Sequence, residues 1–204
     1  MKKVGIVGGT FDPIHNGHLL LAEYAKEEFL LDEIWFIPTG CSYKKADKKV
    51  LPGTIRYELV NRAIANRPDF KCLDMEIRRS GNTYTYETIQ YLKEKYPDYK
   101  FYFILGADCL FDLDKWRNPE IIFKGCEIIA AVRNDSDFGQ MEKVCKEYKD
   151  RYQAKIQLMK FLRMEISSSD IRDRLHHNKS VRYLVPEPVL EFIQEKGLYL
   201  DENI

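Results

Sequence analysis

The sequence predicts an α/β fold in which helices cover both faces of a doubly wound parallel sheet. Apolar runs alternate with amphipathic stretches of helical spacing along the 204 residues, which indicates that strands and helices take turns. Such an alternation favours right-handed crossovers between parallel strands. The chain shows no internal repeat, low-complexity tract or linker, so we expect a single domain over residues 1–204.

Each element is expected from a local pattern. Strands are expected at the apolar runs Val4–Val7, Ile34–Ile37, Phe70–Leu73, Phe101–Leu105, Ile128–Val132 and Ile156–Phe161. Helices are expected between them, at His18–Phe29, Thr54–Asn66, Thr85–Tyr96 and Met141–Tyr152. A Ser/Asp cluster before Ile171 is a typical helix start, and helical spacing returns from Val189 to Gly197. A small helical part therefore follows the sheet.

The composition limits the class of protein. Lys and Arg together number 32, as do Asp and Glu, so no overall charge attracts the chain to nucleic acid or to a membrane. The five cysteines are scattered and form no Cys-x-x-Cys motif, which is typical of reduced thiols. Met1 leads directly into the first expected strand, and no apolar run could span a bilayer. We expect a cytoplasmic protein; whether it forms a homo-oligomer stays open.

The segment from Gly8 to His18 follows the first expected strand and carries the most informative motif. Gly8 and Gly9 lack a Cβ, so a ligand can approach the backbone closely. The free N–H groups at a helix start attract anions such as phosphate. His15 and His18 are three residues apart, which places both on one helix face. The motif therefore predicts a nucleotide phosphate site.

Other kinds of site fit this motif less well. A pair of histidines also occurs in zinc sites, but a catalytic zinc usually has three protein ligands, and no further ligand lies at a suitable spacing. A P-loop, a Gly-x-Gly-x-x-Gly motif and a hydrolase elbow are absent from the sequence. A second turn, Gly106 to Asp108, follows the fourth expected strand, which we expect beside the first. A pocket of amides and imidazoles without a nucleophile suits direct displacement at phosphorus.

Two segments give a specific resemblance. Gly8–His18, which reads GGTFDPIHNGH, and Ile166–Arg172, which reads ISSSDIR, resemble the signature motifs of the nucleotidyltransferases with an HxGH site. From Met1 to about Tyr199 the chain resembles the bacterial nicotinate-nucleotide adenylyltransferases. The resemblance implies a Rossmann-like nucleotidyltransferase fold. It also implies an enzyme of NAD biosynthesis that joins ATP to nicotinate mononucleotide by direct in-line attack, giving deamido-NAD and pyrophosphate.

The resemblance also implies roles on the ATP side of the site. His15 and His18 would contact the ATP phosphates, and His18 would stabilise the charge that develops on the α-phosphate. Arg172 and Ser168 would hold the β- and γ-phosphates, and Mg²⁺ would be carried by the phosphates of ATP rather than by protein ligands. The other residues expected to contact ATP are Gly8, Gly9, Thr10, Phe11, Lys45, Gly106, Asp108 and Ile171.

Three residues are expected, again by resemblance, to bind nicotinate mononucleotide. Trp116 would stack on the pyridine ring, Thr85 with nearby amides would bind the ring carboxylate, and Arg133 would face the phosphate. From the residues alone, Trp116 would be an ordinary core or surface tryptophan, Thr85 a helix N-cap and Arg133 a solvated strand end. By resemblance Asp108 would bind the ATP ribose; from the residues alone it would cap the helix beginning there, and the two roles are compatible. Relatives carry Pro-Pro-His-Lys where this chain has Ser42–Lys45.

Two alternatives remain at this point. The same fold could transfer a nucleotide to another acceptor, such as nicotinamide mononucleotide, phosphopantetheine or a substrate of cytidylyl transfer. A protein of another class, a nucleotide-binding sensor or structural subunit without turnover, would also bind ATP. Intact His15, His18 and Arg172 argue against the binder, because binding alone has less need of groups aimed at a transferring phosphate.

Overall fold

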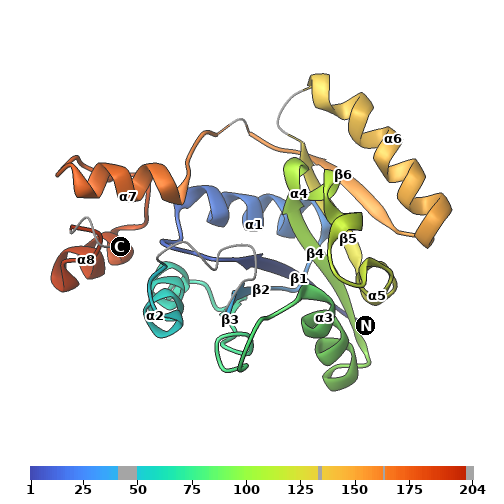
Figure 1. Cartoon of the computed structure of the whole chain (residues 1–204), viewed down its shortest axis with the longest axis horizontal. Coiled ribbons are helices and arrows are strands. Elements are labelled where there is room, and N and C mark those ends of the chain that lie inside the picture. Colours follow the sequence, from blue (N-terminus) through green and yellow to red (C-terminus); the bar gives the residue numbers. More distant parts are fainter. Residues whose placement is uncertain (41–49, 133–134, 163, 201–204) are drawn as a thin grey trace.

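The computed structural model describes residues 1–40, 50–132, 135–162 and 164–200 and confirms the doubly wound α/β fold (Figure 1). The described residues form a six-stranded parallel sheet in the order β3-β2-β1-β4-β5-β6. Its strands are β1 Lys2–Gly9, β2 Glu33–Pro38, β3 Phe70–Cys72, β4 Tyr99–Gly106, β5 Glu127–Val132 and β6 Ile156–Lys160. All six expected strands are present; β1, β2, β4 and β5 are longer than the apolar runs that predicted them, whereas β3 and β6 each end one residue earlier.

The longer helices also lie where the sequence predicts them. They are α1 Asn16–Phe29, α2 Gly53–Ile64, α3 Thr85–Lys95, α6 Asp135–Tyr152, α7 Ser168–His176 and α8 Glu187–Lys196. Three short elements lie between β4 and β5, namely α4 Ala107–Phe111, the 3₁₀ turn η2 Leu113–Lys115 and α5 Pro119–Gly125; only a helix beginning near Asp108 had been considered there. Each is too short to show a helical period in the sequence, so a tertiary contact has to stabilise it.

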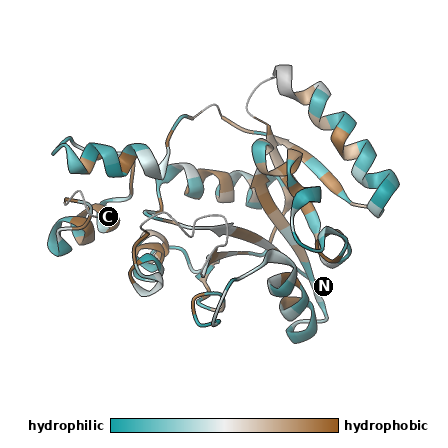
Figure 2. Cartoon of the chain, viewed as in Figure 1, coloured by the Kyte–Doolittle hydropathy of each residue, from teal (hydrophilic) through white to brown (hydrophobic). Residues whose placement is uncertain are grey.

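Alternate residues of each strand enter one of two apolar cores. Val7 and Phe36 pack in the core that α1, α2, α7 and α8 cover, whereas Ile6 and Ile37 pack in the core beneath α3 to α6. Figure 2 shows the hydrophobic residues along the central strands and the hydrophilic ones on the outer sides of α6 and α7. Each fully buried side chain of this size stabilises the fold by about 1.5–3 kcal/mol.

The winding direction reverses between β1 and β4. The chain moves outward from β1 to β3 on one side and from β4 to β6 on the other, as we expected from the sequence. The carboxyl ends of β1 and β4 therefore lie side by side, and the turns after Gly9 and Gly106 flank one crevice. This crevice is where a doubly wound sheet binds its ligands.

The C-terminal part returns to the first half of the chain. The ring of Phe192 in α8 lies 4.4 Å from the guanidinium of Arg62 in α2. Gly197 ends α8 with φ +59°, a left-handed conformation that glycine adopts without strain. Leu198 and Tyr199 then turn back toward β1, where the Tyr199 side chain is 2% exposed. Within the described residues, none of the helices combines the length and the apolar character needed to cross a membrane.

Candidate active site

The loop between β1 and α1 brings the two histidines of the first motif together. His15 occupies the N-cap of α1 and His18 the third position of the helix. Their rings stack with centroids 3.7 Å apart and an angle of 26° between the planes. The prediction that both imidazoles lie on one face at the helix start is therefore confirmed.

The protonation of His18 follows from its surroundings. The backbone N–H of His15 donates to Nδ1 of His18 over 3.2 Å, so the neutral imidazole carries its proton on Nε2. Burial, and secondarily the neighbouring His15, lower the pKa of His18 well below its ordinary value. The rings of Phe11 and His18 form a T-shaped pair with centroids 5.0 Å apart. His18 is thus a fixed, neutral hydrogen-bond donor at pH 7.

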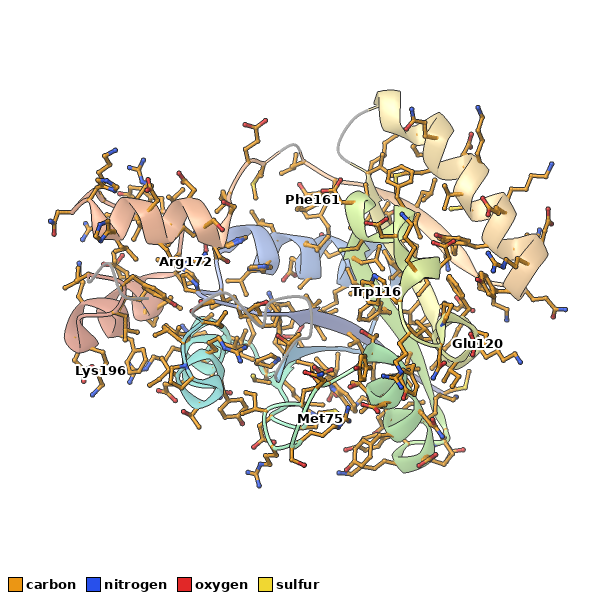
Figure 3. All side chains as sticks on the ribbon, in the orientation of Figure 1. Met75, Trp116, Glu120, Phe161, Arg172 and Lys196 are labelled. Carbon is orange, nitrogen blue, oxygen red and sulfur yellow. The ribbon has the colours of Figure 1, made fainter. Side chains whose placement is uncertain are left out.

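The second motif docks directly on this loop. Ser167 caps α7 by accepting a hydrogen bond from the N–H of Asp170 over 3.1 Å. The hydroxyl of Ser168 donates to the carbonyl of Pro13 over 2.9 Å, and Nη1 of Arg172 donates to the carbonyl of Asp12 over 2.7 Å. Both side chains are partly exposed, and Figure 3 shows Arg172 at the end of α7 that adjoins α1.

Two long-range contacts that we did not predict hold the same loop. The hydroxyl of Tyr199 donates to Oδ1 of Asp12 over 2.8 Å, and both residues are buried. Burial, followed by the carboxylate of Asp12, raises the pKa of Tyr199. Nη1 of the buried Arg56 donates to the carbonyl of Thr10 over 2.7 Å. The loop between β1 and α1 is therefore held in place by contacts within the protein.

Arg56 also links this loop to two other segments. Its Nη2 donates to the carbonyl of Thr39 over 2.8 Å, and its Nε donates to that of Leu51 over 2.9 Å. All three acceptors are backbone carbonyl groups, so the buried guanidinium is well supplied with hydrogen bonds. The only sign of this role in the sequence was that a single arginine stands among the apolar positions of the second expected helix.

Several residues expected to contact ATP also have structural roles. The side chains of Phe11 and Ile171 are buried in the core, so only their backbones can face a ligand. A Cβ on Gly9 would lie 2.9 Å from the ring of Phe11, so the close packing of that ring also requires glycine here. Gly8 and Thr10 lie beside Gly9 at the crevice and line its pocket.

The second turn of the crevice corrects one interpretation. Gly106, not Asp108, occupies the N-cap of α4, so the alternative that Asp108 caps this helix is wrong. Asp108 lies in the first turn of α4 and is exposed. It is therefore accessible to a ligand in the crevice.

A pocket of about 320 Å³ opens next to the crevice. Trp116 follows η2 and forms one wall, and its ring forms a T-shaped pair with that of Phe103, with centroids 6.2 Å apart. Figure 3 shows Trp116 on the α4 side of the sheet. Thr85 lines the same pocket as the first residue of α3. The N-cap of α3 is Tyr84, whose side chain makes no capping bond, so the alternative that Thr85 is the cap is wrong.

The pocket contains a buried carboxylate that sequence reasoning missed. Glu76 is 8% exposed and accepts a hydrogen bond from Oγ1 of Thr88 over 2.7 Å. Thr83 and the backbone of Gly40 also hydrogen-bond to it, yet burial dominates and raises the pKa of Glu76. These contacts tie together three segments of the pocket wall. Two predicted residues, Lys45 and Arg133, lie outside the described residues, as does the segment Ser42–Lys45.

Metal binding is limited by the donors present. Across the described ranges, no group of three or more His, Cys, Asp or Glu side chains could hold a metal ion. The carboxylate of Asp12, which lies in the loop before His15, already accepts the Tyr199 hydroxyl. The described part of the site thus presents hydrogen-bond donors, among them the guanidinium of Arg172, which suit phosphate oxygens.

Comparisons with known proteins agree with this geometry. Residues 6–174 match the family model described as cytidylyltransferase-like. A probable nicotinate-nucleotide adenylyltransferase of Lachnoclostridium phytofermentans is 44% identical over 200 residues, covering 98% of this chain and 100% of the relative. Another, from Dehalococcoides mccartyi, is 43% identical and covers 97% of both chains. The solved Plasmodium falciparum nicotinic acid mononucleotide adenylyltransferase complexed with NaAD superposes with a TM-score of 0.81 at 25% identity, covering 98% of each chain.

Proposed function

Because the chain belongs to the family of nicotinate-nucleotide adenylyltransferases, we propose that it transfers the adenylyl group of ATP to nicotinate mononucleotide. The products are deamido-NAD and pyrophosphate. The observation that carries this proposal is the docking of Arg172 and Ser168 on the loop that presents the stacked pair His15 and His18. A pocket with an aromatic wall, Trp116, lies beside it.

The chemistry is a single displacement at phosphorus. An oxygen of the mononucleotide phosphate forms a bond to the α-phosphorus of ATP, and the bond to the leaving pyrophosphate breaks. Nε2–H of His18 donates to an oxygen of the α-phosphate, where negative charge develops. Arg172 and Ser168 hold the β- and γ-phosphates with His15 beside them. Since these donors are held in place in advance, little reorganisation is needed during transfer.

Mg²⁺ is the metal that this proposal includes. Carried by the phosphates of ATP, it would neutralise part of their charge. Asp108 is the exposed carboxylate at the crevice, and we propose that it binds the ATP ribose. Gly8, Gly9 and Thr10 would lie along the nucleotide, with further contacts from Gly106 and from the residues Phe11, Ile171 and Lys45.

The acceptor side uses the neighbouring pocket. Trp116 would stack on the pyridine ring, Thr85 with the first amides of α3 would bind the ring carboxylate, and Arg133 would face the phosphate. We also propose that residues 1–204 act as one nucleotidyltransferase domain in the cytoplasm. Among the described residues, the reduced thiols of Cys72, Cys126 and Cys145 support that location.

The test is a steady-state assay of pyrophosphate release with ATP and Mg²⁺. The acceptors compared are nicotinate mononucleotide, nicotinamide mononucleotide and phosphopantetheine. We expect the highest kcat/KM with nicotinate mononucleotide. Equal use of the amide would overturn the acceptor assignment, and ATP binding without turnover on any acceptor would favour the sensor. An adenylated side chain trapped on the protein would contradict direct transfer.

A further inference from the structure

Arg117 is a cation at the acceptor pocket that no step described above uses. It follows Trp116 directly, and both residues line the pocket of about 320 Å³. The guanidinium carbon of Arg117 lies 4.7 Å from the centre of the Tyr84 ring, a distance at which a cation is attracted to the face of an aromatic ring. Tyr84 also lines the pocket, and its ring stacks on that of Tyr86 with centroids 6.0 Å apart.

No carboxylate of the described residues forms an ion pair with Arg117; a hydrogen bond to Tyr84, and to a lesser degree the charge of Glu87, raise the pKa of its guanidinium. Glu76, the acid in the same pocket wall, is hydrogen-bonded to Thr88 over 2.7 Å. Glu87, which follows closely on Tyr84, pairs with Arg79 over 3.1 Å and accepts from the hydroxyl of Tyr86 over 3.1 Å. Arg117 is exposed and is the one basic side chain among the described residues that line this pocket.

The acceptor of the proposed reaction carries two charges on its ring. The pyridine nitrogen bonded to ribose is positive, and the ring carboxylate is negative at pH 7. A positive ring favours the face of an aromatic plate such as Trp116. A carboxylate favours a guanidinium, which can donate two parallel N–H bonds to its two oxygens. The chain presents these two groups on consecutive residues, Trp116 and Arg117.

We infer that the Arg117 side chain binds the ring carboxylate of the acceptor and that Tyr84 holds the guanidinium in position. An amide has no charge and offers one oxygen in place of two, so Arg117 gains less from nicotinamide than from nicotinate. Arg117 therefore determines the preference between the two mononucleotides. This inference rests on the proposed function, and it assigns a role to a side chain outside the set expected from the sequence.

The test compares Arg117→Gln with wild type, using kcat/KM for each mononucleotide at saturating ATP. Because a hydrogen bond between charged groups is stronger than one between neutral groups, we expect kcat/KM for nicotinate mononucleotide to fall about tenfold. With nicotinamide mononucleotide it should change less than about twofold, and KM for ATP should not change. Arg117→Lys keeps the charge but loses the forked geometry and should give an intermediate preference.

Lys115→Gln is the matched control. Lys115 lies two residues away, is 71% exposed, pairs with Asp112 and does not line the pocket. It should leave the preference unchanged; an equal loss in this variant would overturn a direct contact, because it would trace the effect to general charge. Tyr84→Phe removes the hydroxyl that bonds to Arg117 but keeps the ring, so it should reduce the preference less than Tyr84→Leu, which removes both contacts. Unchanged preference in Tyr84→Leu would overturn the role of the ring.

The two proposals fail in distinguishable ways. If wild type releases pyrophosphate with neither mononucleotide, the proposed function is wrong. If wild type prefers nicotinate mononucleotide and Arg117→Gln keeps that preference in full, the inference is wrong and the function stands. Arg117 is exposed, so its substitution should leave the thermal midpoint unchanged, which a melting curve of each variant checks.

Discussion

Charged side chains have different hydrogen-bond partners at the two ends of the parallel sheet. At the amino ends of the strands, Glu33 accepts hydrogen bonds from Lys2 and Lys71, each over 2.7 Å, and Glu127 pairs with Lys100 over 2.9 Å. At the carboxyl ends, the guanidinium of Arg172 donates to the backbone carbonyl of Asp12 and not to a carboxylate. Pairing neutralises the charges at the first end, whereas neutral backbone atoms position them at the second.

This difference separates stability from function in one sheet. A cation that is paired with a carboxylate gains little from binding an anionic ligand, because its charge is already compensated. A cation held by carbonyl groups keeps its net charge and is oriented as well. Substitutions at the carboxyl end should therefore lower turnover, and substitutions at the amino end should lower the free energy of unfolding.

The largest effect is expected for His18→Ala. Removing a donor to the transferring phosphate should lower kcat by at least about 10², while ATP binding stays measurable and the free energy of unfolding changes little. Pyrophosphate release and calorimetric titration with ATP measure the two quantities. His177→Ala, on an exposed residue outside both motifs, is the control and should retain full turnover. Nearly normal kcat in His18→Ala would contradict the role of the imidazole.

Arg172→Ala should give the next largest effect. Loss of a charged donor to the β- and γ-phosphates should lower kcat/KM for ATP by roughly 10- to 100-fold. Arg174→Ala is the matched control on the same helix, since Arg174 donates to the carbonyl of Ser180 over 2.8 Å and 3.0 Å. A similar loss of activity in both variants would mean that α7 itself is disturbed. The loss could then not be assigned to the carboxyl end of the sheet.

Glu33→Gln tests the amino end and should affect stability alone. Although burial would raise the pKa of Glu33, hydrogen bonds from Lys2, Lys71 and Trp35 lower it to about 2. The stability that Glu33 contributes is therefore complete above its unfolded pKa, near 4.5, and is lost as the pH falls toward 2. We expect a loss of about 1 kcal/mol at pH 7, the range of partly exposed ion pairs.

Urea unfolding of wild type and Glu33→Gln between pH 7 and pH 2.5 measures this contribution. The difference between the two proteins should shrink as the pH falls below about 4.5, and kcat should be the same in both. A difference in stability that stays constant with pH would show that ion pairing is not its cause. A fall in kcat would show that the two ends of the sheet are not independent.

The smallest effect concerns the pH dependence of turnover. The lowered pKa of His18 keeps its imidazole neutral, so protonation of this group should cause no loss of kcat between pH 8 and pH 6.5. The profile is obtained by measuring kcat of wild type across this pH range, in several buffers at constant ionic strength. A decline with a midpoint near 6.5 that is absent from His18→Ala would show that His18 has its ordinary pKa.

The sequence predicted the sheet because its strands are locally apolar. The reversal between β1 and β4 follows from the alternation of strands and helices together with the rules of right-handed connection. The extents of α4 and η2 could not be predicted, because a residue distant in the sequence stabilises them. The hydroxyl of Tyr148 in α6 donates to the carbonyl of Leu110 over 3.1 Å and accepts from the N–H of Asp114 over 3.3 Å.

The part of the site that depends on local sequence could also be predicted. Its two motifs are short continuous segments, so spacing alone indicated that His15 and His18 are neighbours. The residues that support them are separated from the motifs by long stretches of chain. Local signals in the sequence were only weak for Arg56, Glu76 and the pair of Asp12 and Tyr199. The role of a buried polar side chain depends on its hydrogen-bond partners, and most of these lie far away in the sequence.

The hydrogen bond between Tyr199 and Asp12 also constrains how a newly made chain matures. A ribosome adds Asp12 early and Tyr199 only 187 residues later. Until that tyrosine has left the exit tunnel, the first loop lacks one of its fixed contacts, although most of the sheet can already form. Competence to hold a nucleotide should therefore arise late in synthesis, and incomplete chains should bind ATP poorly.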